Sequence, residues 1–299
     1  MRIPYYGKIY NLGHRSIAGL LDEVVEVQEK VDGSCFSFAN LGGELLMASR
    51  TVPINPSAPH KLFIPAVTTV QRLMDEGDLP EGIIFRGEAM RGKRHNKLTY
   101  RRAPKGGLVL FDAHRQDGSY MSYAPLLSWA QQLGLEIVPQ LALGKFNLDS
   151  LAPYLEAESF LGGKIEGVVV KRFRSWKHSV IPHGKLIRTE FRETQVRKLP
   201  SPKGDLKESL KEVALQFSSP RRWEKTVERL RDEGRLEGGS KDIGPLMGAV
   251  ARDLAEECED EMKHAVWKTM RKPLLRAATQ PIAEWYQKRL ETTDESLDQ

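Results

Sequence analysis

The stretch EKVDGS at residues 29–34 places a lysine at the end of a strand-like run and directly before a turn. The run VVEVQEK (24–30) is rich in β-branched residues, and Asp32-Gly33 favours a tight turn. A lysine at a strand end can point into a cleft, where its neutral amine is a strong nucleophile. Because burial and nearby cations favour the neutral amine, we expect a lowered pKa for Lys30. A solvated hairpin lysine is the alternative interpretation of this stretch taken alone.

Further strand-like runs continue as far as residue 173. They are CFSFAN (35–40), ELLMASR (44–50), IIFRGEA (83–89), GLVLFDAHR (107–115) and IEGVVVKRF (165–173). Turn-forming pairs separate the runs at 24–30, 35–40 and 44–50, so we expect three sequential hairpin strands there. Helical patterns at 62–76 and 123–133 do not alternate regularly with the strands, which argues against a doubly wound parallel sheet. The predicted fold class is therefore α+β with an antiparallel sheet.

The pattern changes at residues 199–204, LPSPKG, which predict a linker. After it, apolar residues recur at helical spacing, as at Leu210, Val213 and Phe217. Pro273 and Pro281 are expected to interrupt later helices. We therefore predict an antiparallel-sheet domain at 1–198 and a small all-helical domain at 205–299.

The composition is that of an ordinary globular protein, with 40% hydrophobic residues and a net charge of +5 over 299 residues. The basic excess lies before residue 200, where 27 Lys and Arg face 20 Asp and Glu, and it suits a polyanionic partner without requiring one. No apolar run is long enough to span a membrane. Cys35 and Cys258 are too few for a disulfide framework and too isolated for a zinc site. We expect a cytoplasmic protein without a membrane partner.

Several short motifs follow the lysine in order. Arg50 ends ASR, Glu88 ends FRGE, Phe111 lies in LFDA, and EGVVVK spans residues 166–171. Attack on a nucleotide α-phosphate builds up negative charge, so it requires cations, a divalent metal and an aromatic platform for the base. These motifs contain basic side chains, carboxylates and an aromatic ring. Core packing is the alternative role for Phe111, because LVLF is an apolar strand.

Together the motifs resemble those of the covalent nucleotidyltransferase superfamily of polynucleotide ligases and mRNA capping enzymes, most closely the RNA ligase 2 type. The resemblance implies that residues 1–198 form a nucleotidyltransferase (adenylation) domain in which Lys30 accepts AMP. It implies a set of nucleotide-binding residues, which are Glu29, Arg50, Glu88, Phe111, Lys171, Lys185 and Arg188. In this set Arg50 is near the ribose or acceptor end, Phe111 stacks on the adenine and Lys171 is near the α-phosphate. Glu166 and Glu88 are implied to hold the metal, directly or through water.

Two positions depart from the family pattern. The fifth motif usually has two lysines separated by one apolar residue, but here Lys185 is followed by Leu186 and Ile187. Either Arg188 takes the second position through a β-bulge, or Lys185 serves alone. The other departure is Cys35, which stands where ligases of this type usually carry an asparagine near the metal.

Basic residues cluster after two of the motifs. The run RGKRHNKLTYRR (91–102) contains Arg91, Lys93 and Arg94, and the segment after EGVVVK contains Arg172 and Arg174. These five residues are candidate contacts for phosphates of a nucleic acid. A solvated loop is the alternative interpretation of the first run.

The resemblance implies an ATP-dependent RNA ligase that joins a 3′-hydroxyl to a 5′-phosphate through a lysyl-AMP intermediate and an adenylated 5′ end. ATP would be the AMP donor and Mg²⁺ or Mn²⁺ the metal. The partner would be RNA ends, in a nicked duplex or a broken strand, and no obligatory protein partner is expected. The alternatives are a DNA ligase, an RNA-capping guanylyltransferase, or a non-catalytic nucleic-acid-binding relative. The first two usually carry a β-barrel domain after the catalytic domain, whereas this sequence predicts helices there.

Overall fold

The computed structural model of the protein describes residues 2–173, 183–188, 190 and 206–294. The chain divides into two compact units, Met1–Arg192 with Glu228–Gly239, and Glu193–Val227 with Ser240–Gln299. The linker predicted at 199–204 lies outside the described residues. Because Glu228–Gly239 belongs to the first unit, a cut at residue 198 would remove part of that unit as well as the helical region.

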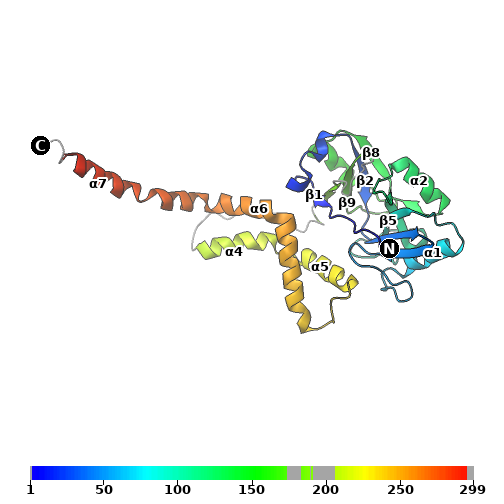
Figure 1. The fold of residues 1–299 in the computed structure, drawn as a ribbon. Coiled ribbons are helices and arrows are strands. Elements are labelled where there is room, and N and C mark those ends of the chain that lie inside the picture. The colour runs from blue at the N-terminus through cyan, green and yellow to red at the C-terminus, as the bar shows by residue number, and fades with distance from the viewer. Residues whose placement is uncertain (1, 174–182, 189, 191–205, 295–299) are drawn as a thin grey trace. The chain divides into compact units, whose positions relative to one another are not determined.

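The N-terminal unit contains two five-stranded sheets (Figure 1). The first sheet has the order β1 (Tyr10–Asn11), β10 (His183–Ile187), β9 (Gly167–Arg172), β2 (Val25–Lys30) and β8 (Gln140–Gly144). The second sheet has the order β4 (Glu44–Ala48), β3 (Ser34–Leu41), β5 (Ile83–Ala89), β6 (Leu108–Arg115) and β7 (Glu136–Ile137). The helices described in this unit are α1 (Ile64–Asp75), α2 (Tyr123–Gln132), α3 (Leu148–Leu151), the end of α5 (Pro220–Asp232) and the 3-10 turns η1 (Arg15–Ile17), η2 (Leu20–Asp22), η3 (Lys105–Gly107) and η4 (Ala152–Glu156).

The predicted α+β class with mainly antiparallel pairing is confirmed, and only the short pairs β1–β10 and β6–β7 are parallel among the described strands. The strands expected at 24–30, 35–40 and 44–50 all form, but the prediction of three sequential hairpin strands is wrong. β3 and β4 form a hairpin, whereas β2 pairs with β8 and β9 in the other sheet. The chain crosses between the sheets after Lys30, where Asp32 accepts from the backbone N–H groups of Lys97 and Leu98.

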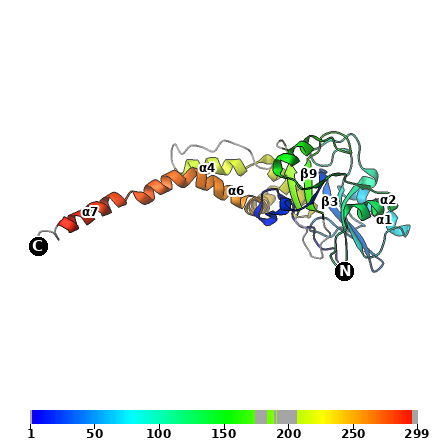
Figure 2. The same ribbon diagram turned by 90° about the horizontal axis from the view of Figure 1, so that it is seen from above.

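The helices α1 and α2 pack on the outer face of the second sheet (Figures 1 and 2). The buried residues of α1 are Ala66, Val67, Val70 and Leu73, at the spacing of one helical face. They join aromatic side chains of β3 and β5 and the buried residues Leu126 and Ala130 of α2 in one core cluster. This cluster supports the second sheet from behind and leaves its inner face for the first sheet.

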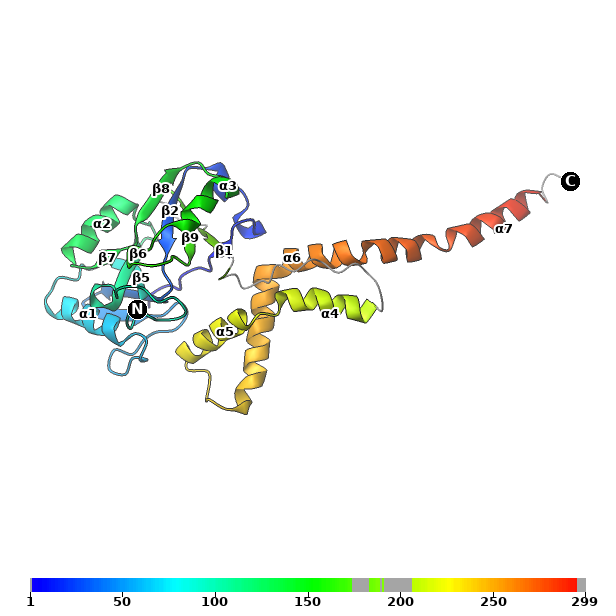
Figure 3. The same ribbon diagram turned by 180° about the vertical axis from the view of Figure 1, so that it is seen from behind.

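The first sheet turns a polar face toward the second. Its strands lie side by side in Figure 3. Because side chains alternate along a strand, Val25 and Val27 of β2 enter the core behind the sheet, whereas Glu26, Gln28 and Lys30 lie on the inner face. The inner face therefore carries charged and amide groups into the space between the sheets.

A β-bulge shapes the facing strand of the second sheet. In the β5–β6 ladder Arg86 pairs with Asp112 and Gly87 pairs with Leu110, so Phe111 is an extra residue in β6. The bulge lets Phe111 and Asp112 both turn inward, while Leu110 and Ala113 remain in the outer core. The aromatic ring of Phe111 and the carboxylate of Asp112 thus lie on the same side of the sheet, although the two residues are adjacent in the strand.

The C-terminal unit is helical throughout its described residues. Its elements are α4 (Leu206–Phe217), the first part of α5 (Pro220–Asp232), the 3-10 turn η6 (Ser240–Asp242), α6 (Ile243–Thr279) and α7 (Ile282–Asp294). The helices α4 and α6 pack through an apolar cluster that includes Val213, Phe217, Cys258 and Ala265.

The two prolines of this unit have different effects. The prediction that Pro273 interrupts a helix is wrong, because α6 continues through it and tolerates the loss of one backbone hydrogen bond. Pro281 does separate α6 from α7. None of the helices described in either unit is both long and apolar enough to cross a membrane.

Candidate active site

Lys30 ends β2 and meets Glu166, which directly precedes β9. The Nζ of Lys30 donates to Glu166 Oε2 at 2.7 Å, and the Lys30 side chain is 21% exposed. The two residues come together because Lys30 pairs with Gly167 across the β2–β9 ladder. Only a glycine fits there, since a Cβ at residue 167 would fall on the carbonyl oxygen of Leu186 in β10. The fold thus joins the lysine motif to the EGVVVK motif.

The charge environment of Lys30 differs from the expected one. Burial lowers the pKa of Lys30, but Glu166, Glu88 and Asp32 together raise it by more, so that the net shift is upward. The prediction of a lowered pKa is therefore wrong, because the groups that act on the amine after burial are carboxylates. Lys30 is held as an ammonium ion and must lose a proton before it can act as a nucleophile.

The turn after Lys30 is fixed by the segment 93–100. Asp32 Oδ2 accepts from the backbone N–H groups of Lys97 and Leu98, each at 2.8 Å, and the backbone N–H of Asp32 donates to the buried Tyr100 hydroxyl at 2.9 Å. A solvated hairpin is therefore not the environment of this stretch. The KVDG sequence is a docking point for a long loop, which holds the end of β2 in place.

His95 secures the same loop. Its Nδ1 accepts from the backbone N–H of Arg91 at 3.1 Å, so its Nε2 carries the proton and donates to Ser34 Oγ at 2.8 Å. Burial lowers the pKa of His95 to about 4, which keeps the ring neutral near pH 7. The candidate nucleic-acid contacts Arg91, Lys93 and Arg94 are exposed on this segment.

Glu88 faces Lys30 from β5. The glycine of KVDG makes this possible, because a Cβ at Gly33 would lie 2.9 Å from Glu88 Cβ and 3.0 Å from the Ala89 carbonyl oxygen. Burial raises the pKa of Glu88 to about 7, although Lys30 and Arg50 lower it. Its Oε2 is buried and has no hydrogen-bond partner among the described residues. The arrangement leaves an unused acceptor oxygen beside Lys30.

Arg50 and Cys35 complete this end of the site. Arg50 follows β4, and its side chain hydrogen-bonds the Cys35 thiol and lowers the pKa of Glu88. Cys35 pairs with Glu88 across the β3–β5 ladder. Burial raises the pKa of Cys35 to about 11, so the thiol is neutral. The position where the family usually has an asparagine is therefore occupied by an un-ionised thiol next to Glu88.

The inner face of the first sheet has three levels, because residues that pair across antiparallel strands share a face. They are Lys30 with Gly167 and Ile187, then Gln28 with Val169 and Lys185, then Glu26 with Lys171 and His183. One level is two residues, or about 7 Å along the strand. Lys185 therefore lies one level from Lys30, and Lys171 lies two levels away.

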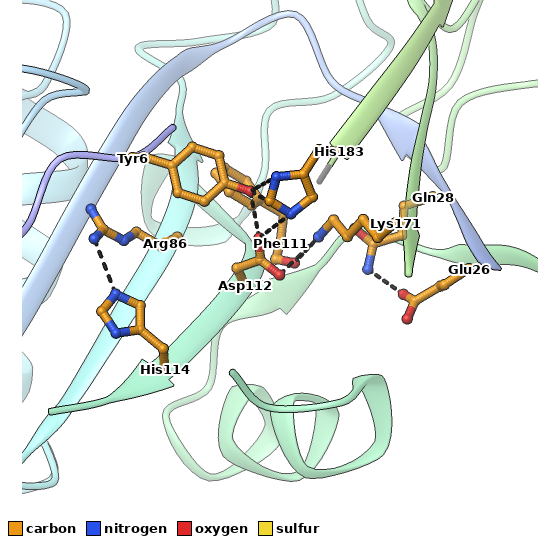
Figure 4. Close-up of polar contacts among 9 residues, drawn as sticks. All are labelled: Tyr6, Glu26, Gln28, Arg86, Phe111, Asp112, His114, Lys171 and His183. Atoms are coloured by element: carbon orange, nitrogen blue, oxygen red, sulfur yellow. Dashed lines mark hydrogen bonds and ion pairs between the residues drawn. The ribbon is translucent and has the colours of Figure 1, made fainter. Parts of the chain in front are cut away.

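Asp112 lies at the centre of a buried polar group that joins the two sheets (Figure 4). Its Oδ1 accepts from Lys171 Nζ at 2.9 Å, and its Oδ2 accepts from the Tyr6 hydroxyl at 2.5 Å. His183 Nε2 is 3.6 Å from Asp112 Oδ2 and 3.3 Å from the Tyr6 hydroxyl. Tyr6, Asp112, Lys171 and His183 are called the Asp112 cluster below.

The electrostatics of the Asp112 cluster favour one ion pair. Burial alone would raise the pKa of Asp112, but Lys171, His183 and the Tyr6 hydroxyl outweigh it, so the pKa lies below its ordinary value. Burial lowers the pKa of His183 to about 4, against the influence of Asp112. The imidazole is therefore neutral near pH 7, and the carboxylate of Asp112 pairs with the ammonium of Lys171.

Phe111 packs in a core cluster and also lines a pocket. Its ring is 9% exposed and packs edge-on against Tyr6, with centroids 5.2 Å apart and an interplanar angle of 62°. Lys171 Nζ lies 5.4 Å from the ring centroid and donates to the Phe111 carbonyl at 2.6 Å. The ring belongs to a core cluster and also lines a pocket with Gln28, Asp112 and Lys171.

Some expected site residues are not brought to Lys30. The carboxylate of Glu29 accepts from Ser159 Oγ at 2.5 Å and from the Phe160 backbone N–H at 3.1 Å. It lies behind the first sheet, since it neighbours Lys30 in the strand. The ammonium of Lys171 is engaged by Asp112, two levels from Lys30.

The two arginine candidates of the first sheet also have other partners. Arg188 donates to the Leu155 carbonyl at 2.6 Å and pairs with Glu156 and Glu190 at 3.3 and 3.1 Å. The β9–β10 register is continuous through Ile187, so no bulge moves Arg188 to the inner face. Arg172 pairs with Glu23 at 3.4 Å. Arg174 lies outside the described residues.

Three residues of the site were not identified from the sequence. The guanidinium of the buried Arg86 lies over the Tyr6 ring, 5.6 Å from its centroid, and donates to the Pro4 carbonyl and to Ser37 Oγ, each at 2.6 Å. Val169 is buried on the inner face, whereas its neighbours in β9 belong to the core behind. His183 could be identified only by recognising the strand β10. Alternation along β10 places His183 on the same face as Lys185.

Comparison with known proteins gives one family. The model of the RNA ligase family matches residues 23–187, more than half of the chain. Three solved structures of a Naegleria gruberi RNA ligase are similar. They are the ligase with PPi (19% identity, TM-score 0.47, covering 63% of this chain and 57% of that chain), a mutant with AMP and Mn (17%, 0.49, 63% and 57%) and a mutant with ATP and Mn (18%, 0.48, 63% and 58%). The match thus spans 57% of the length of the first of these ligases. No match is found among curated protein sequences.

Replacement of Asp112 by Asn should destabilise the protein by about 3–5 kcal/mol near pH 7, because it leaves the Lys171 ammonium buried without its partner. Denaturant unfolding of the two proteins measures the difference. Since the folded-state pKa of Asp112 is lowered, its stabilisation is present above the unfolded-state pKa of about 4 and fades as the pH falls further. The Asp112→Asn/Lys171→Met double variant is the control and should lose less than the sum of the single losses. Additive losses, or a difference that is unchanged at acid pH, would contradict the ion pair.

Replacement of Glu166 by Gln should lower the pKa of Lys30, because a charge that favours the ammonium is removed. Mass spectrometry can follow acylation of Lys30 as a function of pH, and the midpoint should shift to lower pH in the variant. The control is Glu158→Gln, which removes an exposed carboxylate that pairs with Arg101. Equal midpoints in the Glu166→Gln variant and the wild type would show that Glu166 does not act on the amine.

Proposed function

This chain belongs to the RNA ligase family, and we propose that it joins RNA ends in an ATP-dependent reaction with Lys30 as the nucleophile. The observation that carries the proposal is the position of the Lys30 amine, between the carboxylates of Glu166 and Glu88 on the polar inner face of the first sheet. A lysine with only a structural role needs one partner, whereas this amine is partly exposed and faces two acids from two different sheets.

In the first step the neutral Lys30 amine attacks the α-phosphorus of ATP. A P–N bond forms, the P–O bond to pyrophosphate breaks, and the amine gives up its proton. Glu166 is within hydrogen-bond distance of this proton and supports its removal when the nucleotide is bound. The proposal agrees with the upward pKa shift, because an ammonium ion at this position first attracts the phosphates and then loses its proton.

In the following steps AMP moves from Lys30 to the 5′-phosphate of one RNA end. A P–O bond forms between the two phosphates and the P–N bond breaks, which returns the amine. The 3′-hydroxyl of the other end then attacks the activated 5′-phosphorus, and AMP leaves as the strand is joined. The RNA ends would lie in a nicked duplex or a broken strand, and the site of action that we propose is the cytoplasm, without an obligatory protein partner.

Other residues of the inner faces support these steps in the proposal. Lys185 is the nearest cation along the first sheet and would contact phosphate oxygens. Phe111 would carry the base on the ring that lines the pocket. Arg50 would lie near the ribose or the acceptor end, since it contacts Cys35 beside Glu88.

Glu88 and Glu166 are the residues that would hold Mg²⁺ or Mn²⁺, directly or through water. They fit a cation, because both carboxylates act on the same amine and Glu88 Oε2 is buried without a hydrogen-bond partner among the described residues. Among the residues that the structure describes, no group of three or more His, Cys, Asp or Glu side chains could hold a metal ion. Water or phosphate oxygens would therefore complete the coordination shell of the ion. When bound, the ion supplies positive charge that stabilises phosphate oxygens and favours the neutral amine.

The two cations of the fifth motif should differ in a kinetic test. Lys185→Ala should slow the transfer of labelled AMP from ATP to the protein by roughly a hundredfold, as expected when a cation at the reacting phosphate is lost. Arg188→Ala should stay within a few-fold of the wild type, because its guanidinium is bound to Leu155, Glu156 and Glu190. If Arg188→Ala is as slow as Lys185→Ala, a second cation is required and the structure of this segment changes with nucleotide.

Strand joining tests the proposed function directly. The full chain with Mg²⁺ should join nicked RNA with ATP and fail with GTP, and Lys30→Ala should abolish joining because no other amine replaces the nucleophile. Lys105→Ala, which changes an exposed lysine of η3, is the matched control and should retain the activity. Preferential joining of nicked DNA would indicate a DNA ligase, and transfer of GMP without joining would indicate a capping enzyme. RNA binding without any nucleotide transfer would indicate a non-catalytic relative.

A further inference from the structure

Charge is segregated along α6. The segment 253–261 contains six acidic residues and no basic one, whereas the segment 262–280 contains five basic residues and no acidic one. The five are Lys263, Lys268, Arg271, Lys272 and Arg276. They follow one another within about 20 Å of helix, at a rise of 1.5 Å per residue. The helix α6 thus has a strongly acidic segment followed by a strongly basic one.

The basic segment has a buried side and an exposed side. Ala265 and Thr269 are buried, and Ala265 belongs to the apolar cluster between α4 and α6. With 3.6 residues per turn, Trp267 and Arg271 lie on the opposite side of the helix, with Lys268 beside them. Trp267 is 51% exposed, and the neighbouring cations are also exposed. Packing of the unit therefore uses one side of this segment and leaves a basic, tryptophan-bearing side in solvent.

Three acidic residues of α6 form ion pairs within the unit. Asp253 and Glu257 pair with the buried Arg222 of α5, and Glu259 pairs with Lys263 at 2.7 Å. Through residues 206–294, by contrast, no ion pair is formed by the remaining cations, Lys268, Arg271, Lys272 and Arg276. Like charges four residues apart, as at 268, 272 and 276, destabilise a helix by a few tenths of a kcal/mol each. The segment thus carries a cost that an anionic partner would remove.

We infer that the exposed surface of residues 264–276, which includes Lys268, Arg271 and Lys272, binds the phosphate backbone of the RNA substrate. The inference rests on the proposed function, which makes RNA the partner. Lysine and arginine neutralise phosphates and release their counterions, and Trp267 can stack on a base or sugar among these contacts. The surface contributes affinity and no sequence preference, because phosphates are the same at every nucleotide.

An anionic membrane is the other polyanionic surface to consider. An interfacial helix needs a continuous apolar face opposite its charged face. On the side of this segment opposite α4, Lys263 and Arg271 lie one turn before and one turn after Trp267, so cations lie within the face that would enter the lipid. The placement therefore favours a nucleic acid, where cations and an aromatic ring act on the same partner.

The experiment compares two triple variants of the full chain. The test variant is Lys268→Gln/Arg271→Gln/Lys272→Gln. The control variant is Lys211→Gln/Lys241→Gln/Arg252→Gln, which removes the same charge from exposed positions of the same unit outside the basic segment. Fluorescence anisotropy with a nicked RNA duplex, at several salt concentrations, gives the dissociation constant and its salt dependence. Circular dichroism checks that both variants keep their helices.

The test variant should bind the nicked duplex about tenfold or more weakly, and the slope of log Kd against log salt should decrease by about two to three. The control variant should bind like the wild type. Trp267→Ala should weaken binding without a change in slope, since it removes no charge. Equal losses in the two triple variants, unchanged binding in the test variant, or binding to phosphatidylserine vesicles in place of RNA would each overturn the inference. RNA binding needs no ATP, so it can be tested separately from joining. If the wild-type chain joins no RNA ends but still binds the duplex more tightly than the test variant does, the proposed function is refuted and the assignment of this surface stands.

Discussion

The buried ion pair between Asp112 and Lys171 is the contact on which the arrangement of the site depends. It joins β6 of the second sheet to β9 of the first, and the same ammonium holds the Phe111 carbonyl. Because an unpaired charge at this depth costs several kcal/mol, the ion pair strongly stabilises this placement of the two sheets. The Phe111 ring therefore has a defined position relative to the face that carries Lys30. Tyr6 and the neutral His183 complete the joint from the N-terminal segment and β10.

Close backbone contacts set the other end of the inner face. Gly167 lets β9 approach β10, and Gly33 lets the turn after Lys30 approach Glu88. Glu166 and Glu88 then converge on one amine from two sheets, and their charges keep that amine protonated. In the proposed function the two acids would hold a cation and the lysine would meet the phosphates of the nucleotide. A cation and a nucleotide would change the balance that holds the proton, which couples binding to the formation of the nucleophile.

Local patterns in the sequence predicted the strands at 83–89 and 107–115, both long helices of the N-terminal unit and the helical C-terminal region. Pairing was not predictable in the same way, since β2 has its partners more than a hundred residues away and Asp32 binds a loop rather than closing a hairpin. The upward pKa shift of Lys30 follows from which charges face it, and that depends on both sheets. Tyr6 and His183 lie in no sequence motif that identifies them as site residues. The bulge at Phe111 explains how LFDA turns two neighbouring residues inward, which alternation alone would forbid.

Peptide mapping after incubation with ATP and Mg²⁺ tests the central claim most directly. The full chain should gain the mass of one AMP, and fragmentation should locate it on the side chain of Lys30 as an acid-labile phosphoramidate. Added pyrophosphate should remove it, because the first step is reversible. An adduct on another residue, or an unmodified Lys30 in a protein that joins RNA, would show that the amine between Glu166 and Glu88 is not the nucleophile.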